Sequence, residues 1–160
     1  RELRARTLAQ TAELQGDERV LVYTCRFGPD PAAFRRAGAA VLELPCIGML
    51  PPAFIDFVLS RRHADGVVLA GCQDGDCQFR FGIDWTEQRL TGQRDPQLRR
   101  RVPRQRIATL WLGRTDAATI KRELTAFRAR LRALGPYRRD ETGRPDRSEQ
   151  QAVEVPDGAD

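Results

Sequence analysis

The side chains with the clearest potential for chemistry are the four cysteines of the chain, Cys25, Cys46, Cys72 and Cys77. The first three each end an apolar run, and Cys77 follows Cys72 by five residues. Thiolates bind soft metal ions and iron–sulfur clusters strongly, and four of them complete one such site. Reduced thiols that bind a metal or carry out redox chemistry are therefore the first hypothesis.

The compartment decides whether these thiols stay reduced. An even number of cysteines in an exported chain would also be compatible with two disulfides. The sequence shows no basic leader followed by an apolar stretch, and no apolar run of about 20 residues, the length of a membrane-spanning helix. We therefore expect a cytoplasmic protein, free or within a membrane-attached complex. The first residue is Arg1 rather than Met, which is compatible with a processed chain or a piece of a longer one.

Four apolar runs are expected to be the strands that position the cysteines. Their length and their content of β-branched residues are typical of buried strands. The runs are Val20–Cys25, 40–46, 66–72 and 107–112.

Helical patterns lie between these runs. A short helix is expected to begin at Asp30 and Pro31 and to end at Gly38. A second helix begins at the prolines of 51–52, and one of its faces is formed by Phe54, Phe57 and Val58. Residues 84–101 are also expected to be helical, with a break near Gly92 and Pro96.

The clearest helix follows Asp116, a suitable N-cap residue, and is stopped by Gly135 and Pro136. Its apolar residues have helical spacing: Ile120, Leu124, Phe127, Leu131 and Leu134. We expect three segments in all: an N-terminal helix or linker at 1–19, an α/β domain with the cysteines at 20–137, and a polar disordered tail at 138–160.

Strands that alternate with helices predict a parallel sheet with right-handed crossovers. We therefore predict an α/β fold with a small, open, four-stranded parallel sheet and flanking helices, similar to a flavodoxin-like fold or half of a Rossmann fold. Such sheets bind ligands outside the carboxyl ends of their strands. That edge would bring all four cysteines together. The spacing alone does not decide between a zinc site, an iron–sulfur cluster and ordinary buried residues.

The net charge is +5, and Lys121 is the only lysine. Between residues 89 and 106, seven arginines accompany a single acid, Asp95. This basic stretch could dock an acidic partner or form a solvated surface. Nucleic-acid binding is disfavoured, because no aromatic residues are interleaved with the arginines and no binding motif is present.

Several motifs resemble a known family. They are Leu-Pro-Cys-Ile-Gly at 44–48, Ala-Asp-Gly-Val-Val-Leu-Ala-Gly-Cys at 64–72, Gly-Asp-Cys at 75–77, Arg-Ile-Ala-Thr-Leu-Trp at 106–111 and the helix end Leu-Gly-Pro at 134–136. Together they resemble the hydrogenase iron–sulfur subunit family, whose namesake is the delta subunit of the methyl-viologen-reducing hydrogenase. The resemblance covers about residues 20–136.

The resemblance implies a [2Fe–2S] cluster on Cys25, Cys46, Cys72 and Cys77. It further implies a non-catalytic subunit that passes electrons between a hydrogenase or other oxidoreductase and a flavin and iron–sulfur partner of the heterodisulfide-reductase type. The alternative is a structural four-cysteine zinc-binding interaction domain. A dithiol enzyme that exchanges disulfides at Cys72 and Cys77 is less favoured, because this pair does not form a Cys-x-x-Cys motif.

Two positions depart from the family's motifs. The family's first motif is usually Cys-x-x-Cys, whereas this chain reads Cys-Arg-Phe-Gly from Cys25 to Gly28. The family's Gly-Asp-Cys is often followed by His, and here Gln78 occupies that place. Because Gly28 has no sulfur, a thiol relay within the first motif is excluded.

Overall fold

The computed structural model describes residues 1–114 and 117–137. Within these residues, four strands form one parallel sheet in the order β2-β1-β3-β4. The strands are β1 (Val20–Cys25), β2 (Ala40–Leu44), β3 (Gly66–Gly71) and β4 (Ile107–Trp111). The predicted α/β class with an open parallel sheet is therefore confirmed.

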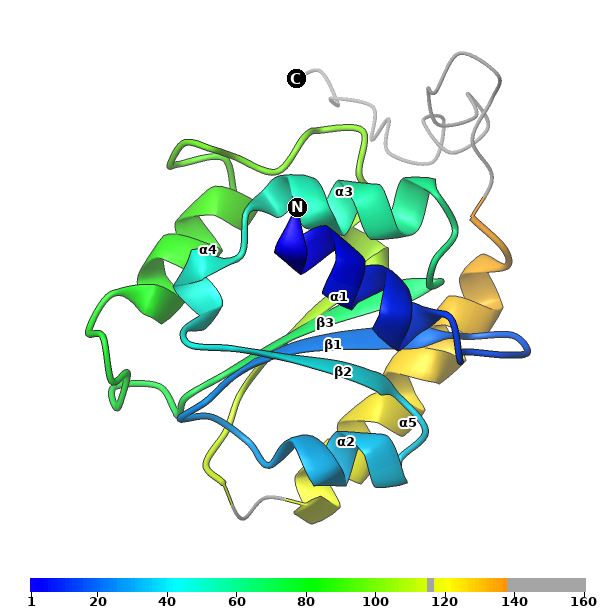
Figure 1. Cartoon of the computed structure of the whole chain (residues 1–160), viewed down its shortest axis with the longest axis horizontal. Helices are drawn as coiled ribbons and strands as arrows, with labels where there is room; N and C mark the ends of the chain where they lie inside the picture. Colours follow the sequence, from blue (N-terminus) through cyan, green and yellow to red (C-terminus); the bar gives the residue numbers. More distant parts are fainter. Residues whose placement is uncertain (115–116, 138–160) are drawn as a thin grey trace, which may run out of the picture.

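Helices cover both faces of the sheet. One face packs against α1 (Glu2–Thr11), α3 (Pro52–Ser60) and α4 (Gly82–Leu90), as Figure 1 shows. The other face packs against α2 (Pro31–Arg36) and α5 (Ala117–Leu134). Two short 3-10 helices, η1 (Ile47–Met49) and η2 (Arg104–Arg106), follow β2 and precede β4.

Apart from the buried Thr24, the central strands carry no strongly polar side chain, because both of their faces are buried. In β1, Leu21 and Tyr23 join the core under α1, α3 and α4, whereas Val20 and Val22 join the core under α2 and α5. At the start of β3, a Cβ on Gly66 would lie 2.7 Å from atoms of both Leu131 and Phe127. This glycine therefore lets α5 approach the sheet closely.

One helix is shorter than its sequence pattern predicts. The predicted break near Gly92 is confirmed, whereas the helix expected beyond it, up to residue 101, is wrong because α4 ends at Leu90. Gly92 has φ +80°, a left-handed conformation that breaks the helix. The chain then continues without helix, and its buried Leu98 and Val102 attach it to the core.

The face of α3 also differs from the pattern expected. Its buried residues are Pro52, Ile55, Asp56, Val58 and Leu59. Phe54 and Phe57 are only half-buried, and their rings contact each other edge to face with centroids 6.3 Å apart. For α5, the predicted cap Asp116 lies outside the described residues, as does the predicted tail.

Many arginines of the basic stretch make contacts within the protein. Arg99 and Arg101 bind the buried carboxylate of Asp56 at 3.2 and 2.7 Å. Arg104 donates to the carbonyl oxygens of Leu98, Arg99 and Val102. These contacts hold the basic stretch in its irregular conformation against the protein. Arginines that were only solvated would not make such contacts.

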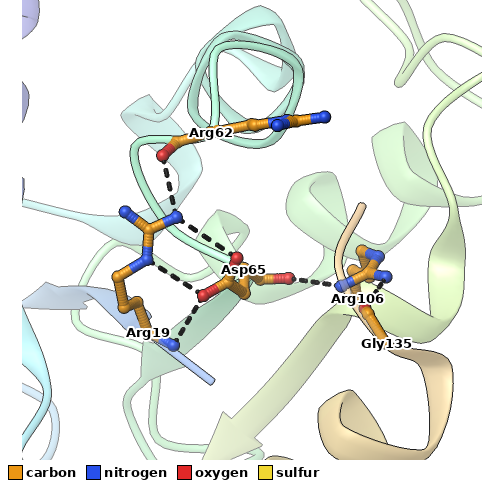
Figure 2. A network of polar contacts seen from close by, with 5 residues as sticks. All are labelled: Arg19, Arg62, Asp65, Arg106 and Gly135. Atoms are coloured by element: carbon orange, nitrogen blue, oxygen red, sulfur yellow. Dashed lines mark hydrogen bonds and ion pairs between the residues drawn. The ribbon is translucent and has the colours of Figure 1, made fainter. Parts of the chain in front are cut away.

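A polar network joins the sheet and α5 at the amino end of the strands (Figure 2). The Arg19 side chain donates to both carboxylate oxygens of Asp65, at 3.0 and 3.3 Å, and to the carbonyl of Arg62 at 3.0 Å. Arg106 donates to the backbone carbonyls of Asp65, at 3.2 Å, and of Gly135. These bonds connect the start of β1, the start of β3 and the end of α5.

Candidate metal centre

Two of the predicted ligands come from the central strands. Cys25 is the last residue of β1, and Cys72 directly follows β3. The two strands are hydrogen-bonded neighbours, so their carboxyl ends lie side by side (Figure 1). The Sγ atoms of Cys25 and Cys72 are 3.4 Å apart. In this sheet β1 and β3 flank the point where the strand order reverses, which is where open α/β sheets bind ligands.

The other two predicted ligands meet beside the start of α4. Cys46 precedes η1, and Cys77 lies in the loop between β3 and α4. A Cβ on Gly82, the first residue of α4, would collide with the Cys46 sulfur and would lie 3.3 Å from the Cys77 sulfur. The structure therefore places the four sulfurs in two pairs at one edge of the sheet.

Burial disfavours the thiolate form of two of these thiols. It raises the pKa of Cys25 to about 12, and the neighbouring Cys72 thiol adds to this rise. Burial also raises the pKa of Cys46. Backbone amides of Phe27 and Cys72 oppose the rise at Cys25, and that of Gly48 opposes it at Cys46. These amides supply donors for an anionic sulfur, as ligand sulfurs require.

Glycines provide the space around the sulfurs. A Cβ on Gly28 would lie 3.0 Å from the Cys25 sulfur and 2.9 Å from the backbone of Gly71. A Cβ on Gly48 would lie 2.9 Å from the α-carbon of Gly82. The loops after β1 and β2 can therefore approach the thiols only because these positions have no side chain. This crowding also explains why a cysteine does not fit at Gly28 without a backbone shift.

The arrangement of the thiols can be compared with what a metal group requires. Among residues 1–114 and 117–137, no three His, Cys, Asp or Glu side chains are arranged as ligands of a single metal ion. A [2Fe–2S] cluster instead takes four cysteines, two on each iron. Two pairs of thiols match that requirement.

An open parallel α/β sheet with four thiols at the carboxyl edge of its strands defines the class of this domain. Comparison with known families identifies the family of this domain. Residues 35–135 match the family described as the methyl-viologen-reducing hydrogenase, delta subunit, and the chain belongs to this family. The family resemblance of the sequence motifs is thus confirmed. Cys25 lies before the matched region, whereas the other three cysteines lie within it.

Two curated relatives are iron-sulfur subunits of F420-non-reducing hydrogenases. The one from Archaeoglobus profundus is 29% identical over 98 residues, which cover 61% of this chain and 71% of the relative. The other, of the vhc hydrogenase of Methanococcus voltae, is 23% identical over 107 residues, covering 66% of this chain and 74% of the relative. Within the described residues of this chain, no helix is both long and apolar enough to span a membrane.

The sequence patterns do not reveal every residue that shapes the site. In the sequence Gly28 stands out only as a missing cysteine, although it lies against the Cys25 sulfur. Gly82 is near Cys77 in the sequence, but its contact with Cys46 depends on the packing of η1 against α4. Gly75, also close in sequence, has φ +81° and nothing within 4 Å of its would-be Cβ, so it serves the turn alone.

Proposed function

We propose that this chain is an electron-transfer subunit that carries a [2Fe–2S] cluster. Cys25 and Cys72 would bind one iron, and Cys46 and Cys77 the other. The observation that carries this proposal is the arrangement of the four thiols in two pairs at the switch point of the sheet. The names of the family and of the relatives, which are hydrogenase subunits, support it.

The cluster would supply the ability to accept and release one electron. The chain's own residues would set how readily this happens. Amides of Phe27 and Gly48 that face the sulfurs favour the more negative, reduced state and thus raise the reduction potential. Burial of Cys25, Cys46 and Cys72 would exclude water from the cluster.

The proposed partners are other redox subunits. The chain would receive electrons from a hydrogenase or other oxidoreductase and deliver them to a flavin and iron–sulfur protein of the heterodisulfide-reductase type. In this role the chain has no substrate chemistry of its own.

Metal and sulfide analysis of protein purified without oxygen tests the proposal directly. About two irons and two acid-labile sulfides per chain, with a visible spectrum that dithionite bleaches, are expected. Zinc without iron or sulfide would instead establish the alternative, a structural four-cysteine zinc site.

Ligand variants test the residues. Cys72→Ser and Cys77→Ser should each lose cluster absorbance and electron flow between partners. Each variant replaces one sulfur of one pair with oxygen, Cys72→Ser in the pair with Cys25 and Cys77→Ser in the pair with Cys46. Gly113→Ala is the matched control, since its Cβ would make only an ordinary contact of 3.5 Å with Gln73. Normal cluster content in both serine variants would refute the ligand assignment.

A further inference from the structure

Large apolar side chains are exposed around the thiols. The exposed fractions are 46% for Phe27, 62% for Met49, 55% for Phe79, 52% for Phe81 and 38% for Trp85. We call these five residues the apolar rim. Among the described residues, one other large apolar side chain is comparably exposed, Leu134 at the far end of α5. Exposure of large apolar groups is thus concentrated at one edge of the sheet.

The apolar rim lies on the segments that bear the cysteines. Phe27 follows Cys25 by two residues, and Phe79 follows Cys77 by two. Their rings contact each other edge to face, with centroids 6.0 Å apart, and so connect the loops after β1 and β3. These two rings flank the loops that position both pairs of thiols.

The rest of the rim continues from these loops onto α4. Phe81 and Trp85 stack with their centroids 5.8 Å apart, on either side of Gly82. Met49 ends η1, which packs against α4. The rim therefore follows the Cys46 and Cys77 segments as well as the Cys25 segment.

Burial in the core does not explain these side chains, and their composition resembles a protein interface. Aromatic residues, methionine and arginine are enriched where proteins bind one another. Arg94 lies over the Trp85 ring, 4.4 Å from its centroid, which extends the flat surface. The rim thus has the chemical character of an interface core.

The charges around the rim show which kind of partner fits. Exposed basic and acidic side chains cancel on the segments that carry the rim and among the arginines that contact them: Arg26, Arg80, Arg94 and Arg114 accompany Asp74, Asp76, Asp84 and Glu87. A nucleic acid or an anionic membrane would require a strong positive excess. A balanced rim with an apolar centre is complementary to an apolar protein surface.

We propose that the apolar rim is the docking surface for the redox partner, and that its occupant is the apolar protein surface around that partner's own cofactor. This inference rests on the proposed function, because electron transfer requires two cofactors to come close. The half-buried Cys77 is the most exposed of the four thiols, and Phe79 and Phe81 lie just beyond it. A partner seated on the rim would therefore meet the thiol site at its most accessible side.

Binding to a defined partner tests the docking surface. The probe is the purified flavin and iron–sulfur subunit of the heterodisulfide-reductase type from the cells that make this chain. Trp85→Ser and Phe79→Ser should each weaken binding by at least about tenfold, as for interface residues at the centre of a contact. Leu134→Ser is the matched control, because Leu134 is as exposed as Trp85 but lies away from the site, and it should change binding less than about twofold.

Three further measurements separate the possible outcomes. Iron content and direct reduction by dithionite should be normal in the rim variants, whereas reduction by the partner should slow in proportion to binding. A photoreactive phenylalanine analogue in place of Phe79 should cross-link to the partner near its cofactor. Rim variants that bind the partner as tightly as the wild type would overturn the docking surface. It would also be overturned if the wild type bound anionic vesicles and the rim variants did not. If the purified protein contains no iron and the rim variants still lose binding to the partner, the docking surface is upheld and the proposed function is overturned.

Discussion

The sulfur atoms of Cys25 and Cys72 lie 3.4 Å apart although 47 residues separate them in the chain. Their closeness follows from the sheet, because β1 and β3 are parallel neighbours in register from Val20 and Gly66 onward. Any change that shifts this register would separate the two sulfurs. The distance between these two sulfurs is therefore set by the pairing of the buried central strands β1 and β3.

Oxidation of the metal-free protein should reveal this pairing. With diamide as the oxidant, the Cys25 and Cys72 thiols should lose two protons and two electrons and form a disulfide, because a disulfide needs sulfurs about 2.05 Å apart and these two need to move little. Peptide mapping without a reductant would identify the linked peptides. The thiolate is the reactive form, and burial raises the pKa of Cys25 to about 12. The fraction of thiolate, and with it the rate of the reaction, should therefore increase from pH 7 to pH 9. A Cys72→Ser variant should give no such peptide, and a cross-link from Cys25 to Cys46 or Cys77 as the main product would contradict the pairing.

The glycine at the start of α4 should be essential for the site. Gly82→Ala would push a methyl group into the Cys46 sulfur and towards Cys77, so we expect it to lose most of the bound iron. Gly113→Ala should retain wild-type iron content, because its methyl group meets only Gln73 at 3.5 Å. Iron and sulfide analysis of both variants makes the comparison. Equal iron content in Gly82→Ala and the wild type would show that the Cys46 and Cys77 sulfurs do not need this space.

The polar network at the amino end of the sheet should affect stability more than cluster binding. Asp65→Ala leaves the Arg19 side chain and its backbone N–H without their carboxylate partner, and both groups are partly buried. We expect a loss of about 1.5–3 kcal/mol in the free energy of unfolding, measured with urea on the metal-free protein. Glu123→Gln is the comparison, since its pair with Arg122 is exposed and should contribute less than about 1 kcal/mol. Similar losses in both variants would mean that the Asp65 network adds nothing beyond a surface ion pair.

His63 should make the protein less stable in mild acid. Burial lowers the pKa of His63 below 6.5, and the positive charges of Arg4, Arg61 and Arg19 lower it further. Its ring packs against Phe57, with centroids 4.9 Å apart. The unfolded chain therefore binds a proton more readily than the folded one, so the free energy of unfolding falls as the pH drops through 6.5.

Urea unfolding at pH 7.5 and pH 5.5 checks this effect. Carboxylates elsewhere also respond to acid, so the comparison is between the wild type and His63→Gln. The variant should lose less stability between the two pH values. An equal loss in both proteins would show that His63 titrates alike in the folded and unfolded chains.

Much of the fold could be predicted from the sequence because the strands are buried on both faces. Runs such as Val20–Cys25 are apolar except for Thr24, and turn residues separate them from helices. The convergence of the cysteines follows from the parallel topology alone. The pairing does not, because β1 has both β2 and β3 as neighbours, and only the packing of η1 against α4 shows that Cys46 lies near Cys77.

The less predictable features depend on contacts between distant segments. The sequence predicts the break near Gly92, but it does not show that the chain beyond the break is irregular, with Arg99 and Arg101 bound to Asp56 on α3. The roles of Gly28 and Gly82 arise only when loops from different strands meet. The exposure of Phe79 and Trp85 also has no local signal, since both residue types are usually buried.

The order of the elements along the chain has a consequence for synthesis. All four cysteines precede residue 78, whereas β4 and α5 begin at Ile107 and Ala117. At about 5–20 residues per second, a growing chain would expose its complete set of thiols for a few seconds before the strand that completes the sheet emerges from the ribosome. The ligands of the proposed cluster would therefore first be exposed on an unfinished sheet.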